Sequence, residues 1–224
     1  MGHPAAVTVQ PAPDIAPDML DLTRRERRKL ELRSRVRDTA AELFRAQGFA
    51  ATRVSEICER ADIAQKTFFN HFPSKHDVLR EVAQASVEAL RLELESVRKA
   101  ELSTRERLRV FFEHVAEGIT ESGPTNRELV TELVHVLNAG EERSIQATML
   151  LDAFGAIVHS GLAAGEITRR HSPETLTEMI LGAYYVLIFN YANLEAFPIA
   201  EHAAASARFL ADALAPHPDE TEED

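Results

Sequence analysis

Tryptophan is absent from this 224-residue chain, cysteine occurs once and glycine only nine times. The single cysteine, Cys58, excludes an internal disulfide and a cysteine-rich zinc site. The scarcity of glycine disfavours a fold built from strands and tight turns. The longest apolar run, Met179–Phe189, has 11 residues, whereas a membrane-spanning helix needs about 20. We therefore expect a helical protein without a transmembrane segment.

The two ends of the chain differ in composition from its middle. Residues 1–23 carry four prolines and little periodicity, and no basic segment leads into an apolar core. We therefore expect a disordered arm there and no signal peptide. The acidic residues 216–224 are expected to form a disordered tail. The lone cysteine and the missing signal peptide together favour the cytoplasm.

The net charge of −11 is distributed unevenly along the chain. Residues 24–80 hold 14 Lys and Arg against 8 Asp and Glu, whereas residues 81–224 hold 11 against 25. A basic segment therefore precedes an acidic body, which suggests that one part meets a polyanion and the other does not. A solvated basic helix face would give the same count.

Apolar residues recur at helical spacing along almost the whole chain. In the first such stripe, Val36, Ala40 and Leu43 precede Gly48, a residue that commonly ends helices. Residues suited to capping a helix start are Thr23, Thr52, Ser74 and Ser172. The predicted helices cover residues 24–47, 54–61, 65–71, 75–100, 104–121, 125–139, 141–164, 173–194 and 199–215. The expected fold class is all-α.

Two short helices with a brief turn between them follow a longer basic helix, which is the pattern of a helix-turn-helix unit. The second short helix has one face with these side chains: Gln65, Lys66, Phe69 and Asn70. Phe68 points elsewhere and is expected to anchor the helix. A helix exposed on one side fits the DNA major groove, where Gln and Asn pair with adenine and Lys pairs with guanine. Lys75, just past this helix, is placed for a phosphate.

The segment Ala51–Leu79, ATRVSEICERADIAQKTFFNHFPSKHDVL, closely resembles the DNA-binding segment of the TetR family of bacterial transcriptional regulators. Ala40–Phe49 matches the end of that family's first helix, and Gly161–Ala192 resembles its ligand-binding and dimerising domain. The resemblance implies a helix-turn-helix domain over residues 24–73 and a helical ligand-binding and dimerisation domain over residues 74–215. It also implies a homodimer that represses transcription at a palindromic operator in double-stranded DNA. A small-molecule effector would release that dimer.

The resemblance also assigns roles to single residues. Base contacts are expected from Gln65, Lys66 and Asn70. Further contacts, mainly to phosphates, are expected from Thr52 or Arg53, Ser55, Thr67, His71 and Lys75.

The chain departs from the family's pattern at three positions. Asp62 stands where glycine is common in the turn, and Asp tolerates the left-handed conformation. Ala64 replaces the usual Ser cap, at a cost of about 1 kcal/mol unless Asp62 caps the helix instead. Phe69 replaces the usual Tyr and lacks a hydroxyl that would bind phosphate.

The C-terminal helices carry two further predictions. Helical bundles build ligand sites from facing side chains, and the candidates here are Phe112, His135, Met149, Leu150, Phe154 and Tyr184. Helices that are apolar over much of their surface need burial on more than one side. We therefore expect the last two helices to form a four-helix bundle with a second subunit, and packing within one subunit is the alternative. The candidate interface residues are Leu176, Ile180, Leu187, Ile188, Tyr191, Ala203, Ala207, Leu210 and Leu214.

Other chemically notable residues have simpler explanations. The basic cluster is Arg24, Arg25, Arg27, Arg28 and Lys29. We favour a contact with the DNA backbone over a solvated helix start, because the helix dipole disfavours cations there. Cys58 is expected to be a small core residue. The scattered histidines of the C-terminal region are expected on the surface or in the core, not around a metal.

The sequence features bear on three possible functions. A ligand-responsive DNA-binding repressor agrees with the split charge. A DNA-binding regulator or architectural protein without an effector stays open, because periodicity does not reveal a cavity. An all-α enzyme or ligand carrier is disfavoured, since no paired carboxylates, nucleophile and base, or metal-ligand spacing is found. We expect neither catalysis nor a cofactor.

Overall fold

The structure is a computed structural model that describes residues 23–121, 127–138 and 145–220. Within these ranges the chain forms helices joined by turns and contains no strand, so the predicted all-α class is confirmed. The helices are α1 (Arg24–Gln47), α2 (Val54–Arg60), α3 (Gln65–His71), α4 (Lys75–Lys99), α5 (Thr104–Glu121), α6 (Arg127–Asn138), α7 (Ile145–Ala163), α8 (Pro173–Asn193) and α9 (Ile199–Ala213).

Of the two segments expected to be disordered, the N-terminal arm lies almost wholly outside the described residues and the C-terminal tail lies partly outside them. Residues 1–22 of the arm lie outside the described residues, and so do residues 221–224 of the tail. Inside the expected tail, Pro218–Glu220 forms a short 3-10 helix.

Three of the predicted caps start their helices as expected. The Thr23 hydroxyl accepts a hydrogen bond from the Glu26 amide at 3.3 Å, and the Glu26 carboxylate accepts one from the Thr23 amide at 2.8 Å. The Ser74 hydroxyl caps α4, and the Ser172 hydroxyl caps α8. These bonds satisfy amides that an isolated helix start leaves without partners.

The first four helices share one hydrophobic core, which we call the head core. It contains Val36, Ala40, Leu43, Phe44, Ile57, Cys58, Ala61, Phe68, Phe72, Val78, Leu79 and Val82. Cys58 is buried in this core, as predicted. The α1 residues in it come only from the second half of that helix, so the first half lies outside the core.

A second hydrophobic core, which we call the body core, joins α4 to the helices that follow. Its largest fully buried side chains include Phe111, Phe112, Leu150, Phe154, Ile157 and Ile180. None of the helices in the described ranges is long and apolar enough to cross a bilayer.

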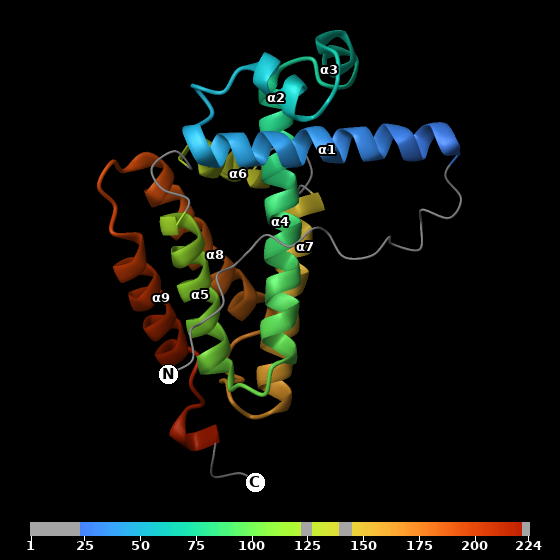
Figure 1. Ribbon diagram of the computed structural model, residues 1–224. Helices are drawn as coiled ribbons and strands as arrows, with labels where there is room; N and C mark the ends of the chain where they lie inside the picture. The colour runs from blue at the N-terminus through green and yellow to red at the C-terminus, as the bar shows by residue number, and fades with distance from the viewer. Residues whose placement is uncertain (1–22, 122–126, 139–144, 221–224) are drawn as a thin grey trace, which may run out of the picture.

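Helix α4 belongs to both cores. Val78 and Val82 near its start lie in the head core, whereas Val87 and Leu94 lie in the body core. Figure 1 shows α4 running from the head at the top, past α1, to the far end of the body. The domain boundary expected after residue 73 therefore coincides with the start of a helix that connects the two parts.

The end of α7 is joined to the start of α5 by a carboxylate. Glu166 accepts hydrogen bonds from the Thr104 amide at 2.6 Å and from the Thr104 hydroxyl at 2.7 Å. Gly165, at φ +67°, provides the left-handed turn that leads to Glu166. Gly161 permits the close approach, because a Cβ there would lie 2.5 Å from the Thr104 hydroxyl oxygen.

Candidate nucleic-acid interface

The turn between α2 and α3 has the backbone that the sequence predicted. Asp62 has a φ of +52°, and in the described chain it is the non-glycine residue with positive φ. The Ile63 amide bonds to the Cys58 carbonyl at 3.0 Å, which closes the turn. Ala64 is the N-cap of α3 and no side chain caps this helix, so Asp62 does not replace the missing serine.

Two phenylalanines attach α3 to the head. Phe68 and Phe72 are both fully buried, with ring centroids 5.6 Å apart. The predicted anchoring role of Phe68 is therefore confirmed. The Arg33 guanidinium lies 4.5 Å from the centre of the Phe72 ring and donates to the His71 carbonyl at 2.7 Å. Helix α3 is thus held at a fixed angle by contacts on one side and at its end.

The opposite side of α3 is open to solvent. The exposed side chains are Gln65, Lys66, Phe69 and Asn70. Phe69 is 51% exposed, which is unusual for a phenylalanine with a full core next to it. Thr67 and His71 flank this surface and are half-buried. The structure thus brings together the residues expected to contact bases, and their contacts stay predictions.

Thr52 and Arg53 differ in their availability. Thr52 is 1% exposed, and its hydroxyl donates to the Gly48 carbonyl at 2.7 Å. The expectation that Thr52 caps α2 is wrong: Arg53 occupies the N-cap position, and the Arg53 amide donates to Glu56 at 2.6 Å. Of the two alternatives for a phosphate contact, Arg53 is therefore the exposed one. Ser55 is also exposed.

Lys75 has partners that the sequence did not suggest. Its ammonium donates to the carbonyls of Phe49 at 2.5 Å and Thr52 at 2.8 Å, and lies 4.2 Å from the centre of the Phe49 ring. Burial lowers the pKa of Lys75, although Glu128 and Glu56 act in the opposite direction. This ammonium is thus bound to carbonyls of the loop between α1 and α2, and the expected phosphate contact of Lys75 stays a prediction.

His71 ends α3 without a partner for one ring nitrogen. Its Nδ1 is buried and has no hydrogen bond in the described chain. Burial first, and then the charges of Arg33 and Lys29, lower the pKa of His71. Both effects favour the neutral imidazole in the free protein.

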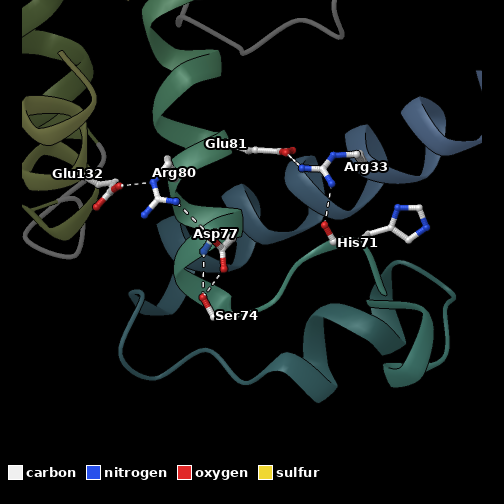
Figure 2. Close-up of polar contacts among 7 residues, drawn as sticks. All are labelled: Arg33, His71, Ser74, Asp77, Arg80, Glu81 and Glu132. Carbon is white, nitrogen blue, oxygen red and sulfur yellow. Dashed lines mark hydrogen bonds and ion pairs between the residues drawn. The ribbon is translucent and has the colours of Figure 1, made fainter. Parts of the chain in front are cut away.

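A set of polar contacts connects the head to α6 (Figure 2). Arg80 on α4 bonds to Asp77 at 3.2 Å and to Glu132 of α6 at 3.4 Å. On the other side of α4, Glu81 pairs with Arg33 of α1. The Glu132 side chain is only 13% exposed, whereas that of Arg80 is 54% exposed, so only the carboxylate of this pair is shielded from solvent.

Helix α6 also contacts the head core and the end of α8. Leu129 packs against the head core. Arg127 donates to the carbonyls of Tyr191, Leu194 and Glu195, at 2.9 Å for Leu194 and 3.1 Å for Glu195. One short helix therefore touches both the head and the C-terminal end of α8.

Four of the candidate pocket residues lie buried in the body core: Phe112, Leu150, Phe154 and Tyr184. The ring of Phe111 stacks edge-on against Phe154 at 5.1 Å, and Phe154 lies 6.3 Å from Tyr184. Met149 is half-buried, and the side chain of His135 lies outside the described residues. The part of these residues in ligand binding stays a prediction.

Two open grooves lie on α8, at positions that sequence reasoning missed. A groove of about 280 Å³ runs between α7 and α8 and is lined by Ala147, Leu151, Glu178, Leu181, Gly182 and Tyr185. A second groove, of about 350 Å³, lies between α8 and α9 and includes Met179, Val186 and Asn190. Periodicity does not reveal such grooves, because they depend on which helices become neighbours.

The candidate interface residues are buried within the single chain. They are all at most 8% exposed: Leu176, Ile180, Leu187, Ile188, Tyr191, Ala203, Ala207, Leu210 and Leu214. They belong to the body core, and their part in a dimer interface stays a prediction. Helix α8 is apolar on several sides, and the sequence does not say which side meets its own chain.

The outer faces of α8 and α9 hold other apolar side chains. Those with large exposed fractions are Met179, Val186, Phe189 and Phe209. Phe209 alone is 71% exposed. Figure 1 shows α9 at one edge of the body beside α5, with α8 passing behind α5. Such a patch is typical of a surface that another protein covers.

The head matches known regulators in sequence. A family described as "Bacterial regulatory proteins, tetR family" matches residues 36–82, which run from the buried part of α1 into α4. HTH-type transcriptional regulator TcmR of Streptomyces glaucescens is 38% identical over 71 residues. That match covers 32% of this chain and 31% of TcmR, so it spans less than a third of the relative's length.

The whole fold also has relatives among solved structures. Thermus thermophilus FadR, a TetR family repressor solved with lauroyl-CoA, has a TM-score of 0.59 at 24% identity, covering 81% of this chain and 94% of FadR. A TetR-family regulator of Pectobacterium atrosepticum has a TM-score of 0.66 at 18% identity, covering 84% and 94%. At these identities the likeness concerns the fold. The helix-turn-helix segment of this chain is therefore similar to that of the tetR family of bacterial regulatory proteins, and the helical fold behind it is similar to that of solved regulators.

Proposed function

We propose that this protein is a transcriptional regulator that binds a DNA operator through α3. The observation that carries the proposal is the open face of α3 opposite its buried phenylalanines. The side chains of that face suit base edges, because Gln and Asn pair with adenine and Lys with guanine acceptors. The basic head and the acidic body agree with DNA lying against the head alone.

The regulator acts as a homodimer in this proposal. The outer faces of α8 and α9 supply the interface, since their exposed apolar side chains need a cover. A two-fold dimer presents two copies of α3, and two such helices bind half-sites about one helical turn apart. The operator is therefore palindromic, and a dimer bound there would repress transcription.

A small molecule bound in the body would release the dimer from DNA. Thermus thermophilus FadR was solved with lauroyl-CoA and Bacillus subtilis FadR with stearoyl-CoA, which makes these two compounds reasonable first probes. Helix α6 supports a connection between body and head, because it contacts the head core through Leu129 and the end of α8 through Arg127.

The test is selection of bound sequences from a random duplex library with the purified full-length protein near physiological salt. A palindromic motif with half-sites about one helical turn apart is expected. Weak, salt-sensitive binding without an enriched motif would exclude sequence-specific recognition. A motif without two-fold symmetry would exclude the dimeric arrangement.

A regulator without an effector is the second candidate, and the packing of the body favours it. The aromatic side chains of Phe111, Phe154 and Tyr184 pack together where a central ligand would lie. The deciding measurement is release from the selected operator in the presence of lauroyl-CoA, stearoyl-CoA and a broad metabolite set. Release with a matching rise in the melting temperature of the free protein supports the effector-responsive regulator, and no release by any compound supports the second candidate.

A further inference from the structure

The first part of α1 projects beyond the head. Every side chain from Arg24 to Glu31 is exposed, and the first buried residue of the helix is Val36. Figure 1 shows this end of α1 continuing past α4 on the side where α3 lies. Eight helical residues span about 12 Å, so the projection reaches well past the packed part of the head.

The projecting segment is strongly basic and its charges are not neutralised locally. Residues 24–31 hold five Lys and Arg against two Glu. The Glu26 carboxylate is occupied by the hydrogen bonds of the Thr23 cap. Among the described residues, no ion pair involves any of these five cations, whereas Arg33 and Arg37 of the same helix are both paired.

One side of this segment looks toward the end of α3. Lys29 lies one helical turn before Arg33, and Arg25 lies one turn before Lys29. Arg33 bonds to the His71 carbonyl at the end of α3. Lys29 is also near enough to help lower the pKa of His71. Arg28 is exposed and lies three residues after Arg25, so the two side chains are neighbours on the helix surface.

These cations do not serve the helix itself. Cations at the start of a helix oppose the positive end of its dipole, so they reduce the stability of α1 by a small amount. A cluster of five cations that does not stabilise its own helix is better explained by contact with an external polyanion. The acidic body does not meet this need, because the projection extends away from it on the side of α3.

We propose that Arg25, Arg28 and Lys29 form a second DNA contact, which binds backbone phosphates of the duplex that flanks the half-site under α3. This inference rests on the proposed function. A reach of about 12 Å corresponds to three or four base-pair steps. Phosphate contacts add affinity and salt dependence without adding base preference. The segment thus lengthens the bound DNA and leaves the recognised sequence unchanged.

The test compares four full-length proteins on three duplexes. The proteins are the parent, Arg25→Gln/Arg28→Gln/Lys29→Gln, the charge-keeping Arg25→Lys/Arg28→Lys/Lys29→Arg, and a body control, Lys99→Gln/Arg109→Gln/Arg170→Gln, with the same change in net charge. The duplexes are the selected motif alone, the motif extended by about one helical turn of arbitrary sequence at each end, and random sequence. Binding constants are measured across a range of salt concentrations.

The parent is expected to bind the extended duplex more tightly than the short one, whatever the flanking sequence. The glutamine variant should lose this difference and keep the selected motif. Its slope of log K against log salt on the extended duplex should fall by about 0.9 for each phosphate that the variant no longer neutralises. The charge-keeping variant should behave as the parent does. Circular dichroism should be unchanged throughout, since all the substituted side chains are exposed.

Two results would overturn the flanking contact: a glutamine variant with the parent's slope on every duplex, or a body control whose slope falls as far as that of the glutamine variant. If the selection yields no motif, the proposed sequence-specific function fails. The random duplex then decides the flanking contact alone, because a reduced slope for the glutamine variant supports it and an unchanged slope refutes it.

Discussion

Two lysines of the head have different surroundings, which assign Lys75 a role in folding and leave Lys66 free for binding. Lys66 is exposed on α3, whereas Lys75 is held by backbone carbonyls between α1 and α2. A charged donor bound to carbonyls contributes to folding, while an exposed lysine contributes little. Replacing Lys75 should therefore reduce the stability of the fold, whereas replacing Lys66 should leave it almost unchanged.

Lys75→Ala is expected to lower the free energy of unfolding by about 1.5–3 kcal/mol, because carbonyls of the loop between α1 and α2 lose a charged donor. Urea unfolding followed by circular dichroism measures this. Lys66→Ala is the matched control and should stay within about 0.5 kcal/mol of the parent. Equal stability of the two variants would contradict the role given to Lys75.

Asn70→Ala should reduce discrimination at one operator position by about 1–3 kcal/mol, since alanine cannot form the two hydrogen bonds to a base that asparagine forms. Competition binding between the selected operator and its single-base variants measures the effect. Phe69→Tyr provides the contrast, because a hydroxyl added there would contact phosphate and strengthen binding to all sequences about equally. Unchanged discrimination in Asn70→Ala would mean that α3 does not read bases through this residue.

Sequence reasoning identified the open face of α3 but not the role of Lys75. The face follows from helical spacing, which is a local property of residues 65–71. The partners of Lys75 are backbone carbonyls of the loop between α1 and α2, and carbonyls have no side-chain pattern to detect. The acceptor of the Thr52 hydroxyl is likewise a backbone carbonyl, that of Gly48, which the sequence does not reveal. The residue type alone therefore suggested, wrongly, that Thr52 caps α2.

At the scale of helices, the junction of α5 and α7 depends on a residue without a side chain. A Cβ at Gly161 would lie 2.5 Å from the Thr104 hydroxyl, which is itself bonded to Glu166. The hydroxyl therefore has little freedom to move away. The segment Gly161–Ile167 thus holds α5 and α7 together in three ways. Gly161 allows the close approach, Gly165 makes the left-handed turn, and Glu166 supplies the carboxylate.

Gly161→Ala is expected to destabilise the protein by about 1–3 kcal/mol through this overlap. Gly118→Ala in α5 is the matched control, because no atom lies within 4 Å of its Cβ position. That substitution should be neutral or stabilising by up to about 1 kcal/mol. Thermal unfolding of the two variants measures the difference, and a stable Gly161→Ala would contradict the close packing.

Neighbouring residues of α9 should have separate effects on assembly and stability. Phe209→Asp should weaken dimerisation by about 2–4 kcal/mol, as expected for an exposed aromatic anchor replaced by a charge. Leu210→Ala should instead lower the free energy of unfolding by about 2–5 kcal/mol, because Leu210 lies in the body core. Sedimentation equilibrium and urea unfolding distinguish the two effects. A dimeric Phe209→Asp protein would exclude this face as the interface.

The helices themselves were predictable because their ends carry local signals. Thr23, Ser74 and the Ser172-Pro173 pair mark starts, and Gly48 marks a stop. The face that α8 turns outward was not predictable. Val186 and Leu187 are adjacent apolar residues, yet one is exposed and the other buried. Which of them meets the rest of the chain is decided by α7 and α9, not by the sequence of α8.

At the scale of the whole molecule, α4 makes the head and body depend on each other for stability. It contributes side chains to both cores, so loss of either core removes the partners of one half of the helix. Two regions joined in this way are expected to unfold in one cooperative step.

Single tryptophans can test this cooperativity, because the chain has none of its own. Phe69→Trp reports on the head and Phe197→Trp on the body, and their thermal transitions should coincide. Adding Ala85→Pro should separate the two transitions, because proline inside a helix costs about 3 kcal/mol or more and Ala85 lies between the two cores. Separate transitions without the proline would refute the shared stability.

The length of α4 also determines how far the head moves when the body end of this helix rotates. Its 25 residues span about 37 Å, with the head at one end and the body at the other. If the body end rotates by about 5°, the head moves by about 3 Å, which is close to the rise of one base pair. In a symmetric dimer two such levers move together, so their displacements add. In the proposed dimer, an angular change of only a few degrees would therefore be enough to bring the two copies of α3 out of register with DNA.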